Sequence, residues 1–242
     1  LFSKLATLGV PQPIAQLLIQ WHQDTRYHLA ANGVEEPIAV GRGLRQGCKA
    51  APLLWNLNIL IFLTELSHRT GPDWTQRCLN IYADDGQMGD VFCSGTDLQA
   101  LLAKIRITLD LLQEHGMTIN SAKCTVLLAM TGTAHRKLRA SLTTFRDGKG
   151  WLLLPAADKP TIWLPVHDKV IYLGAVMSYK HMEDQTMMHR IQLSRIAFGR
   201  LSRWLKGKRG LPRQQRLQLW ATCVYPVLSY GLRSEERRVG KE

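Results

Sequence analysis

The hydrophobic pattern divides the start of the chain into a helix, a hairpin and a second helix. The segment from Pro13 to Gln23 (PIAQLLIQWHQ) has apolar residues at helical spacing and begins with a proline, which favours a first helical turn. The segment RYHLAANGVEEPIAV predicts two strands turning at Asn32-Gly33, the strongest short hairpin signal. A glycine-punctuated loop, GRGLRQGCKAAP, then leads to an apolar helix predicted from Leu53 to Leu66.

A second hairpin and an amphipathic helix follow. The segment CLNIYADDGQMGDVF predicts a hairpin with Asp84-Asp85-Gly86 at its tip. Apolar residues recur at helical spacing from Thr96 to His115. Thr96 belongs to the residue types that cap a helix N-terminus, and Gly116 stands where a C-terminal glycine is expected.

The remaining sequence predicts short strands and then helices. A strand is expected from Lys123 to Ala129, a basic helix near Ala134 to Leu142, and a hairpin or loop in FRDGKGWLLLP. The segment VIYLGAVMS, from Val170, predicts a strand and turn, and helices are expected from Gln185 to Leu205 and from Pro212 to about Cys223. This order predicts the α+β class, with helices packed on one face of an antiparallel sheet.

Charge and cysteine usage narrow the classes of protein. The 242 residues carry a net charge of +12, which indicates a polyanionic partner, either nucleic acid or an anionic membrane surface. Five dispersed cysteines without a CxxC pair argue against a disulfide framework and a zinc site. Free thiols are typical of a reducing compartment, so an intracellular location, cytoplasmic and/or nuclear, is expected. No apolar run is long enough to span a membrane.

The basic charge is concentrated after residue 183. No acidic residue occurs from Gln185 to Ser234. The predicted domains are therefore 1–183, a basic helical region 184–232 and a charged tail 233–242. We expect the basic helices to contact phosphates rather than read bases, on the premise that they lack interleaved aromatic residues. The cations expected to contact a nucleic-acid backbone are Arg195, Arg200, Arg203, Lys206, Lys208 and Arg209.

Two loops carry candidate chemistry. Asp84 and Asp85 are adjacent carboxylates whose repulsion a divalent cation such as Mg²⁺ would relieve, although Asp-Asp-Gly is also compatible with a solvated β-turn. In the glycine-punctuated loop, Arg45 and Lys49 supply phosphate-seeking charge just before a helix N-terminus. The alternative for this loop is an ordinary surface segment that enters a core helix.

The two loops together resemble a known family. The pattern G-L-R-Q-G-C-x-x-x-P-x-L-x-N, from Gly43, followed by Y-A-D-D, resembles the second and third conserved blocks of the reverse transcriptase palm. The resemblance implies that Gln46 and Gly47 shape the pocket for nucleotide and template, with Arg45 facing phosphates. It also implies that Asp84 and Asp85 bind catalytic Mg²⁺ (or Mn²⁺) and that Tyr82 lies near the primer end.

Later segments extend the resemblance, which covers about residues 1 to 232. The run from Gly116 to Cys124 is similar to the fourth block, in which Lys123 would assist pyrophosphate departure; an ordinary exposed lysine is the alternative. Tyr172-Leu173-Gly174 resembles the primer-grip turn of non-LTR and intron-type enzymes. The opening segment and the helical end, through YPVLSYGL, resemble LINE-like elements.

The resemblance implies a right-hand polymerase with partial fingers, a palm and a helical thumb. Such an RNA-directed DNA polymerase adds dNTP substrates to a DNA primer on an RNA template by two-metal catalysis. Two alternatives are a catalytically dead, polymerase-derived protein that binds nucleic acid and a maturase-like protein that binds intron RNA. The expected partners include no membrane.

The sequence departs from the family pattern in three places. The aspartate of the first palm block would lie upstream of Leu1, so we expect residues 1–242 alone to be inactive. Ala50-Ala51 replaces the usual Ser or Leu-Ser before the loop proline. The end from Ser234 to Glu242 (SEERRVGKE) breaks from the thumb pattern, as an unrelated tail or a solvated charged end would.

Overall fold

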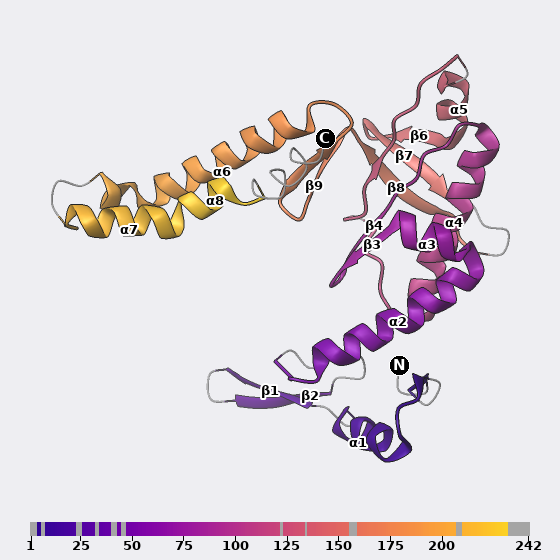
Figure 1. Cartoon of the computed structure of the whole chain (residues 1–242), viewed down its shortest axis with the longest axis horizontal. Coiled ribbons are helices and arrows are strands. Elements are labelled where there is room, and N and C mark those ends of the chain that lie inside the picture. The colour runs from indigo at the N-terminus through magenta and orange to yellow at the C-terminus, as the bar shows by residue number, and fades with distance from the viewer. Residues whose placement is uncertain are drawn as a thin grey trace, which may run out of the picture. The chain divides into compact units, whose positions relative to one another are not determined.

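In this computed structural model, the described residues are 4–5, 8–22, 26–31, 34–39, 43–44, 47–121, 123–133, 135–154, 159–206 and 210–231. They form a mixed α+β structure whose elements are labelled in Figure 1. The chain divides into two compact units. The first unit comprises residues 1–119 and 154–158, and the second comprises residues 120–153 and 159–242.

The first unit opens with a helix and a hairpin, as predicted. Helix α1 spans Gln12–His22, and strands β1 (Arg26–Ala31) and β2 (Val34–Ala39) pair antiparallel with Ala31 opposite Val34. This register leaves two residues between the strands, which confirms the hairpin. The turn residues Asn32 and Gly33, and Gln23 after α1, lie outside the described residues.

Two consecutive helices follow. Helix α2 spans Ala51–Thr70, so it is longer at both ends than the predicted helix from Leu53 to Leu66. Pro52 lies in the first turn, where it has no helical hydrogen bond to lose. Helix α2 ends before Gly71, and Pro72 begins a short helix, α3 (Pro72–Cys78). The hydrophobic pattern did not predict this helix because it is only two turns long.

Helix α4 (Gly95–Glu114) is capped at both ends, but not by Thr96. Ser94 is the N-cap: its side chain accepts a hydrogen bond from the Asp97 backbone, and Asp97 accepts one from the Ser94 backbone in return. The Thr96 assignment was wrong because the helix starts one residue before it. Gly116 lies after the C-cap with φ +79°, as predicted, and its N–H donates to Gln113 at 2.9 Å.

The core of the first unit lies between α2 and α4 (Figure 1). Phe62 and Leu66 of α2 and Leu111 of α4 are fully buried together. Strands β3 (Leu79–Tyr82) and β4 (Asp85–Met88) pair antiparallel beside this core. Leu79 and Ile81 pack against the core cluster, so apolar burial fixes the orientation of the hairpin that carries the Y-A-D-D motif.

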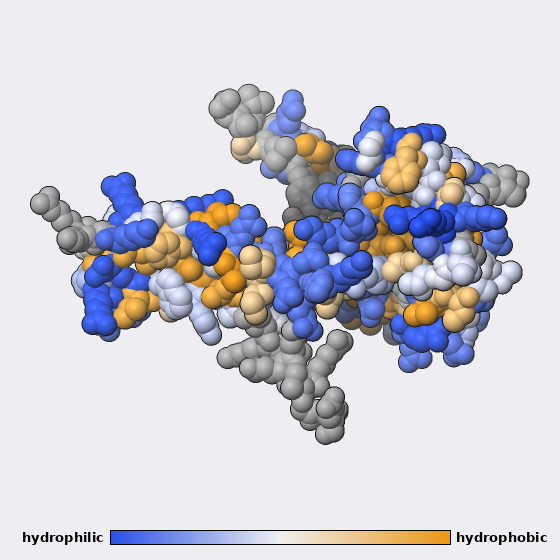
Figure 2. All heavy atoms as spheres, turned by 90° about the horizontal axis from the view of Figure 1, so that it is seen from above, coloured by the Kyte–Doolittle hydropathy of each residue, from blue (hydrophilic) through white to orange (hydrophobic). Residues whose placement is uncertain are grey.

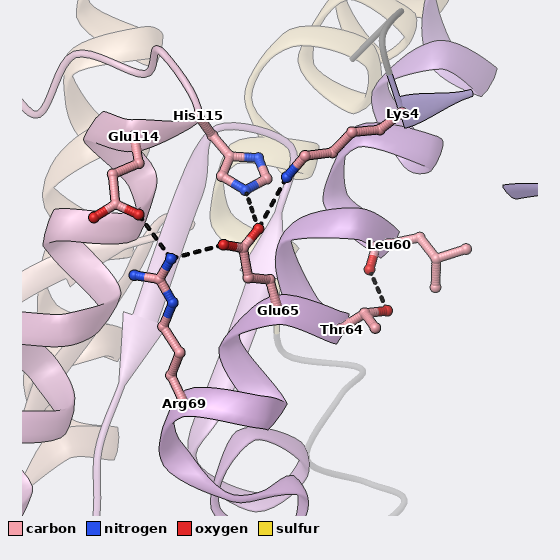
Figure 3. A network of polar contacts seen from close by, with 7 residues as sticks. All are labelled: Lys4, Leu60, Thr64, Glu65, Arg69, Glu114 and His115. Carbon is pink, nitrogen blue, oxygen red and sulfur yellow. Dashed lines mark hydrogen bonds and ion pairs between the residues drawn. The ribbon is translucent and has the colours of Figure 1, made fainter. Parts of the chain in front are cut away.

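A polar network joins the start of the chain to α2 and α4 (Figure 3). Glu65 binds Lys4 Nζ at 3.0 Å, Arg69 Nη2 at 2.7 Å and His115 Nε2 at 3.2 Å, and Arg69 also binds Glu114 at 2.8 Å. The hydrogen bond from Lys4, opposed by burial and reinforced by His115 and Arg69, lowers the pKa of Glu65 to about 2. The network therefore stabilises the first unit only while Glu65 is ionised.

The second unit contains a four-stranded sheet in the order β5-β8-β7-β6. Its strands are β5 (Val126–Leu127), β6 (Thr143–Arg146), β7 (Lys149–Leu154, whose last residue belongs to the first unit) and β8 (Ile162–His167). Strands β6 and β7 are antiparallel, but β5 and β8 are parallel, so the prediction of a wholly antiparallel sheet was wrong. The strand expected from Lys123 to Ala129 is only two residues long, and β8 was not predicted.

Helices and a second hairpin complete the second unit. Helix α5 spans His135–Leu142, close to its prediction, and β9 (Lys169–Tyr172) pairs antiparallel with β10 (Ala175–Ser178). Helices α6 (Met182–Leu205), α7 (Arg213–Cys223) and α8 (Tyr225–Ser229) pack together at the end of the chain. The predicted helical end is confirmed, with α6 starting three residues earlier than expected.

Candidate active site and nucleic-acid interface

The Y-A-D-D motif forms the end of the β3–β4 hairpin. Tyr82 pairs with Asp85, so the turn consists of Ala83 and Asp84, and Ala83 has φ +52°. The prediction that Asp84-Asp85-Gly86 forms the tip was therefore wrong in part, because Asp85 and Gly86 belong to strand β4. This register places Leu79 opposite Met88, which pairs two apolar side chains at the inner end of the hairpin.

Both carboxylates of the motif are accessible. Asp84 and Asp85 are exposed, and neither side-chain carboxylate forms a hydrogen bond or ion pair within the described part of the chain. Adjacent carboxylates with no cation beside them suit a hard divalent ion, since Mg²⁺ prefers carboxylate oxygens. The described residues contain no group of three or more His, Cys, Asp or Glu side chains that could hold a metal. Asp84 and Asp85 thus fit Mg²⁺ as two ligands of a larger set.

The base of the hairpin is held by a different carboxylate. Arg77 Nη2 lies 3.3 Å from Asp90 Oδ2, and the Gly89 N–H donates to the Cys78 carbonyl at 3.0 Å. Burial acts to raise the pKa of Asp90, but hydrogen bonds from the Val91 N–H and Cys78, together with Arg77, lower it overall. Asp90 is therefore engaged at the end of the hairpin opposite the turn.

The glycine-punctuated loop is described in part. Arg45 and Gln46 lie outside the described residues, whereas Gly47 and Lys49 are exposed. The loop ends at α2, whose N-cap, Ala50, makes no side-chain capping bond. In the first turn of α2 the Ala51 N–H donates to the Cys48 carbonyl at 3.1 Å and Pro52 has no N–H, so few backbone donors remain there for an anion.

The predicted site residues are divided between the units. Tyr82, Asp84 and Asp85 belong to the first unit, and Tyr82 is 67% exposed. Lys123 belongs to the second unit and is exposed, and its backbone N–H donates to the Asn120 carbonyl at 2.9 Å. The role predicted for Lys123, to assist pyrophosphate departure, stays a prediction.

The predicted primer-grip residues form a tight turn. Tyr172 ends β9, and Leu173 and Gly174 form the two-residue turn before β10, with φ +45° and +81°. Positive φ at both central positions is the type I′ geometry, which matches the twist of a hairpin. Leu173 is 42% exposed at this turn, so the turn presents an apolar side chain to the outside.

A buried arginine fastens this turn to the helices. The Arg190 guanidinium donates to the Gly174 carbonyl and lies 4.3 Å from the ring centroid of Tyr230. Arg190 is 7% exposed, and Thr186, one turn earlier in α6, accepts from the Val176 N–H at 3.1 Å. Sequence reasoning missed both roles. The available signal was that Arg190 is a cation on the inward, apolar face of the helical pattern.

The cations that were predicted to contact a nucleic-acid backbone differ from Arg190 in their burial. Arg195, Arg200, Arg203 and Lys206 are exposed, whereas Lys208 and Arg209 lie outside the described residues. A hollow of about 790 Å³ between the β9–β10 hairpin and α6 is lined by Lys169, Ile171 and Arg195 among others. It brings one predicted backbone contact together with the strand that leads into the primer-grip turn.

The premise that these helices lack aromatic neighbours was wrong. The Arg203 guanidinium lies 5.3 Å from the Trp204 ring centroid, and Lys206 Nζ lies 5.4 Å from that of Phe198. Hydrophilic and hydrophobic residues are accordingly interspersed on the surface of α6 and α7 (Figure 2). Cations held on aromatic rings can contact phosphates and also present flat surfaces to bases.

Comparison with known proteins identifies the family. None of the described helices is long and apolar enough to cross a membrane. No curated protein and no solved structure matches the chain. The family model for reverse transcriptase (RNA-dependent DNA polymerase) matches residues 1–177, which include the glycine-punctuated loop, the Y-A-D-D hairpin and the primer-grip turn. The chain therefore belongs to the reverse transcriptase (RNA-dependent DNA polymerase) family.

Proposed function

We propose that this chain is the polymerase region of a non-LTR retrotransposon reverse transcriptase. It transfers nucleotides from dNTP substrates to the 3′-hydroxyl of a primer on an RNA template. One observation carries the proposal: within the family match, Asp84 and Asp85 are adjacent, exposed and unpaired among the described residues. A solvated turn needs only one turn-forming aspartate, whereas a metal site gains from two.

Each predicted site residue has a role in this proposal. Asp84 and Asp85 would hold Mg²⁺ or Mn²⁺, which supplies activation of the attacking hydroxyl and neutralises charge on the transferred phosphate. Tyr82 is the last residue of β3, close in sequence to the two aspartates, and would lie near the primer end. Lys49, just before α2, would face the triphosphate. Arg45, Gln46, Gly47 and Lys123 keep the nucleotide-pocket and phosphate roles that the family resemblance implies.

The thumb assignment is supported by the arrangement of the second unit. The Tyr172-Leu173-Gly174 turn leads through β10 into α6, and α7 and α8 pack with α6. A basic helical bundle after a primer-grip turn suits a thumb that holds a primer–template duplex through its phosphates. The division into partial fingers, palm and thumb is part of this proposal.

Primer extension by the full-length natural protein tests the proposed activity. We expect Mg²⁺-dependent extension of a DNA primer on an RNA template, and its loss on Asp84→Asn or Asp85→Asn. Asp73→Asn is the matched control, because Asp73 is an exposed aspartate on α3 of the same unit. Extension by Asp84→Asn at the rate of the control would contradict the proposal.

Two further outcomes would replace the proposed activity. Tight binding of primer–template without extension by any variant would indicate a nucleic-acid-binding protein that performs no chemistry. Binding restricted to intron RNA would indicate a maturase-like partner.

A further inference from the structure

One face of the four-stranded sheet carries cations and tryptophans. In the β6–β7 register, Arg146 pairs with Lys149 and Thr144 pairs with Trp151. Directly paired residues project from the same face, and residues two apart along a strand share it. Arg146, Lys149, Thr144 and Trp151 therefore lie on one face of the sheet.

Trp163 of β8 belongs to the same face. The Arg146 guanidinium lies 4.2 Å from the Trp163 ring centroid. Independently, a Cβ built on Gly150 would lie 3.7 Å from the Val166 Cβ, so Val166 is on the face opposite Trp151. Side chains alternate along a strand, which places Trp163 opposite Val166 and beside Arg146.

The two faces of the sheet differ in burial. Leu152 and Leu164, on the face of Gly150 and Val166, are 2% and 6% exposed. On the other face, Trp151 and Trp163 are half-buried, and Arg146 and Lys149 are exposed. The sheet thus buries Leu152 and Leu164 on one face, where Phe145 of the edge strand is nevertheless 71% exposed, and carries two half-buried indole rings and two exposed cations on the other.

The segment from residue 136 to residue 149 is strongly positive. Helix α5 leads directly into β6, and its Arg136, Lys137 and Arg139 are exposed. These three cations, Arg146 and Lys149 form no ion pair within the described part of the chain. Asp147, at the β6–β7 turn, is the carboxylate nearest to them in the sequence. An unneutralised cluster of this kind favours a polyanion.

We propose that this face binds unpaired RNA of the template strand. Bases of single-stranded RNA stack on aromatic rings and on guanidinium planes exposed on a sheet, while nearby cations contact the phosphates. A charged edge strand can also serve only to prevent sheet aggregation. That explanation covers Arg146 on the edge strand β6, but it does not account for two half-buried indoles or for Lys149 on β7.

The surface shares no residue with the carboxylate site. None of its residues belongs to the predicted catalytic, primer-grip or thumb sets. The proposal uses the RNA dependence of the family but not the identity of the metal ligands. It can therefore fail while the proposed polymerase activity stands, and the reverse also holds.

The test is binding of a fluorescein-labelled uridine decamer to the full chain in EDTA, followed by anisotropy. Arg146→Ala/Lys149→Ala should weaken binding roughly ten-fold at low salt, since two phosphate contacts are lost. Trp163→Leu should weaken it by a similar factor, roughly ten-fold, through loss of stacking. Lys180→Ala is the control, because it removes an exposed cation from elsewhere in the same unit and should leave affinity within about two-fold.

Competitors decide how the RNA is held. An unlabelled single strand should displace the probe far better than an RNA duplex of the same length, because paired bases cannot stack on the indoles. Equal competition by the duplex, or tighter binding of a thymidine decamer than of the uridine decamer, would overturn the proposal. Wild-type affinity in Arg146→Ala/Lys149→Ala, with unchanged circular dichroism and melting temperature, would also overturn it. The doubly substituted cations are exposed, so this variant remains informative if Trp163→Leu fails to fold.

Discussion

The Arg190 guanidinium of helix α6 donates a hydrogen bond to the carbonyl of Gly174, in the turn predicted to be the primer grip. A Cβ added to Gly174 would collide with that guanidinium and come within 3.1 Å of Tyr230. Two features therefore favour glycine at position 174: the backbone φ of +81° and the Arg190 guanidinium, which occupies the space that a side chain would need. The turn and the helical bundle consequently form a single packed assembly within the second unit.

Gly174→Ala should destabilise the second unit by about 2 kcal/mol, because a side chain is strained at positive φ and meets Arg190. Arg190→Ala should cost about 2–3 kcal/mol through the loss of a buried, charge-assisted hydrogen bond. The double variant should be less destabilised than the sum, since removal of Arg190 also removes the collision. Urea unfolding of the four proteins gives the coupling free energy, and strict additivity would contradict the contact.

The capping of α4 gives a local test. Ser94→Ala should lower the free energy of unfolding by about 1 kcal/mol, because the first turn loses the acceptor for the Asp97 N–H. Thr96→Ala is the control and should have a clearly smaller effect, since Thr96 is inside the helix and its hydroxyl contacts the Ser94 hydroxyl at 2.8 Å rather than the Asp97 N–H. Equal decreases in the free energy of unfolding of the two variants, measured by urea unfolding, would contradict the assignment of Ser94 as the N-cap.

The Glu65 network predicts a pH dependence of stability. The pKa of Glu65 is about 2 in the folded chain, below its ordinary value of 4.5, so ionised Glu65 favours the folded state. This contribution is complete above about pH 4.5 and is lost as the pH falls towards 2. Glu65→Gln should therefore cost about 1 kcal/mol near neutral pH and progressively less below pH 4.5.

The matched control for the network is Glu36→Gln, which changes an exposed glutamate on β2 of the same unit. Its stability relative to the unsubstituted protein should vary little over the same pH range. A constant difference between Glu65→Gln and the unsubstituted protein from pH 7 to the acid limit would show that Glu65 acts through packing rather than charge.

The exposed arginines of α6 predict salt-dependent binding. Arg200→Ala/Arg203→Ala should flatten the dependence of log K on log salt for a primer–template duplex by about one unit per lost phosphate contact. Gln192→Ala/Gln214→Ala changes two exposed neutral side chains on α6 and α7 and should leave the slope unchanged. An identical slope in the arginine variant, at equal folding, would remove these arginines from the binding surface.

Local signals in the sequence predicted most elements, and distant contacts explain the rest. Local sequence patterns were sufficient to predict features that depend on residues close in sequence. These features are the hairpin at Asn32-Gly33, the C-terminal end of α4 at Gly116 and the turn at Leu173-Gly174. The parallel pairing of β5 with β8 joins residues about forty positions apart, and no local pattern encodes it. Short elements such as β5 are also too brief to show a period.

In the candidate site, too, local features could be predicted from the sequence and long-range contacts could not. The Y-A-D-D hairpin was predictable as a hairpin, but its turn is set by the pairing of Leu79 with Met88 against the core. Arg190 could not be assigned to the primer-grip turn, because the contact exists only once α6 packs on β10. The basic, tryptophan-bearing sheet face likewise requires the register of β6 and β7 and the placement of Trp163.

The central claim is that Asp84 and Asp85 bind the divalent ion of a polymerase, and Mn²⁺ binding tests it most directly. Titration of the full chain with Mn²⁺, followed by electron paramagnetic resonance, should show a site that Asp84→Asn weakens roughly ten-fold or more while the melting temperature is retained. Asp73→Asn, an exposed aspartate on α3, should bind Mn²⁺ like the unsubstituted protein. Unchanged Mn²⁺ affinity in Asp84→Asn would contradict the account and leave this pair a solvated turn.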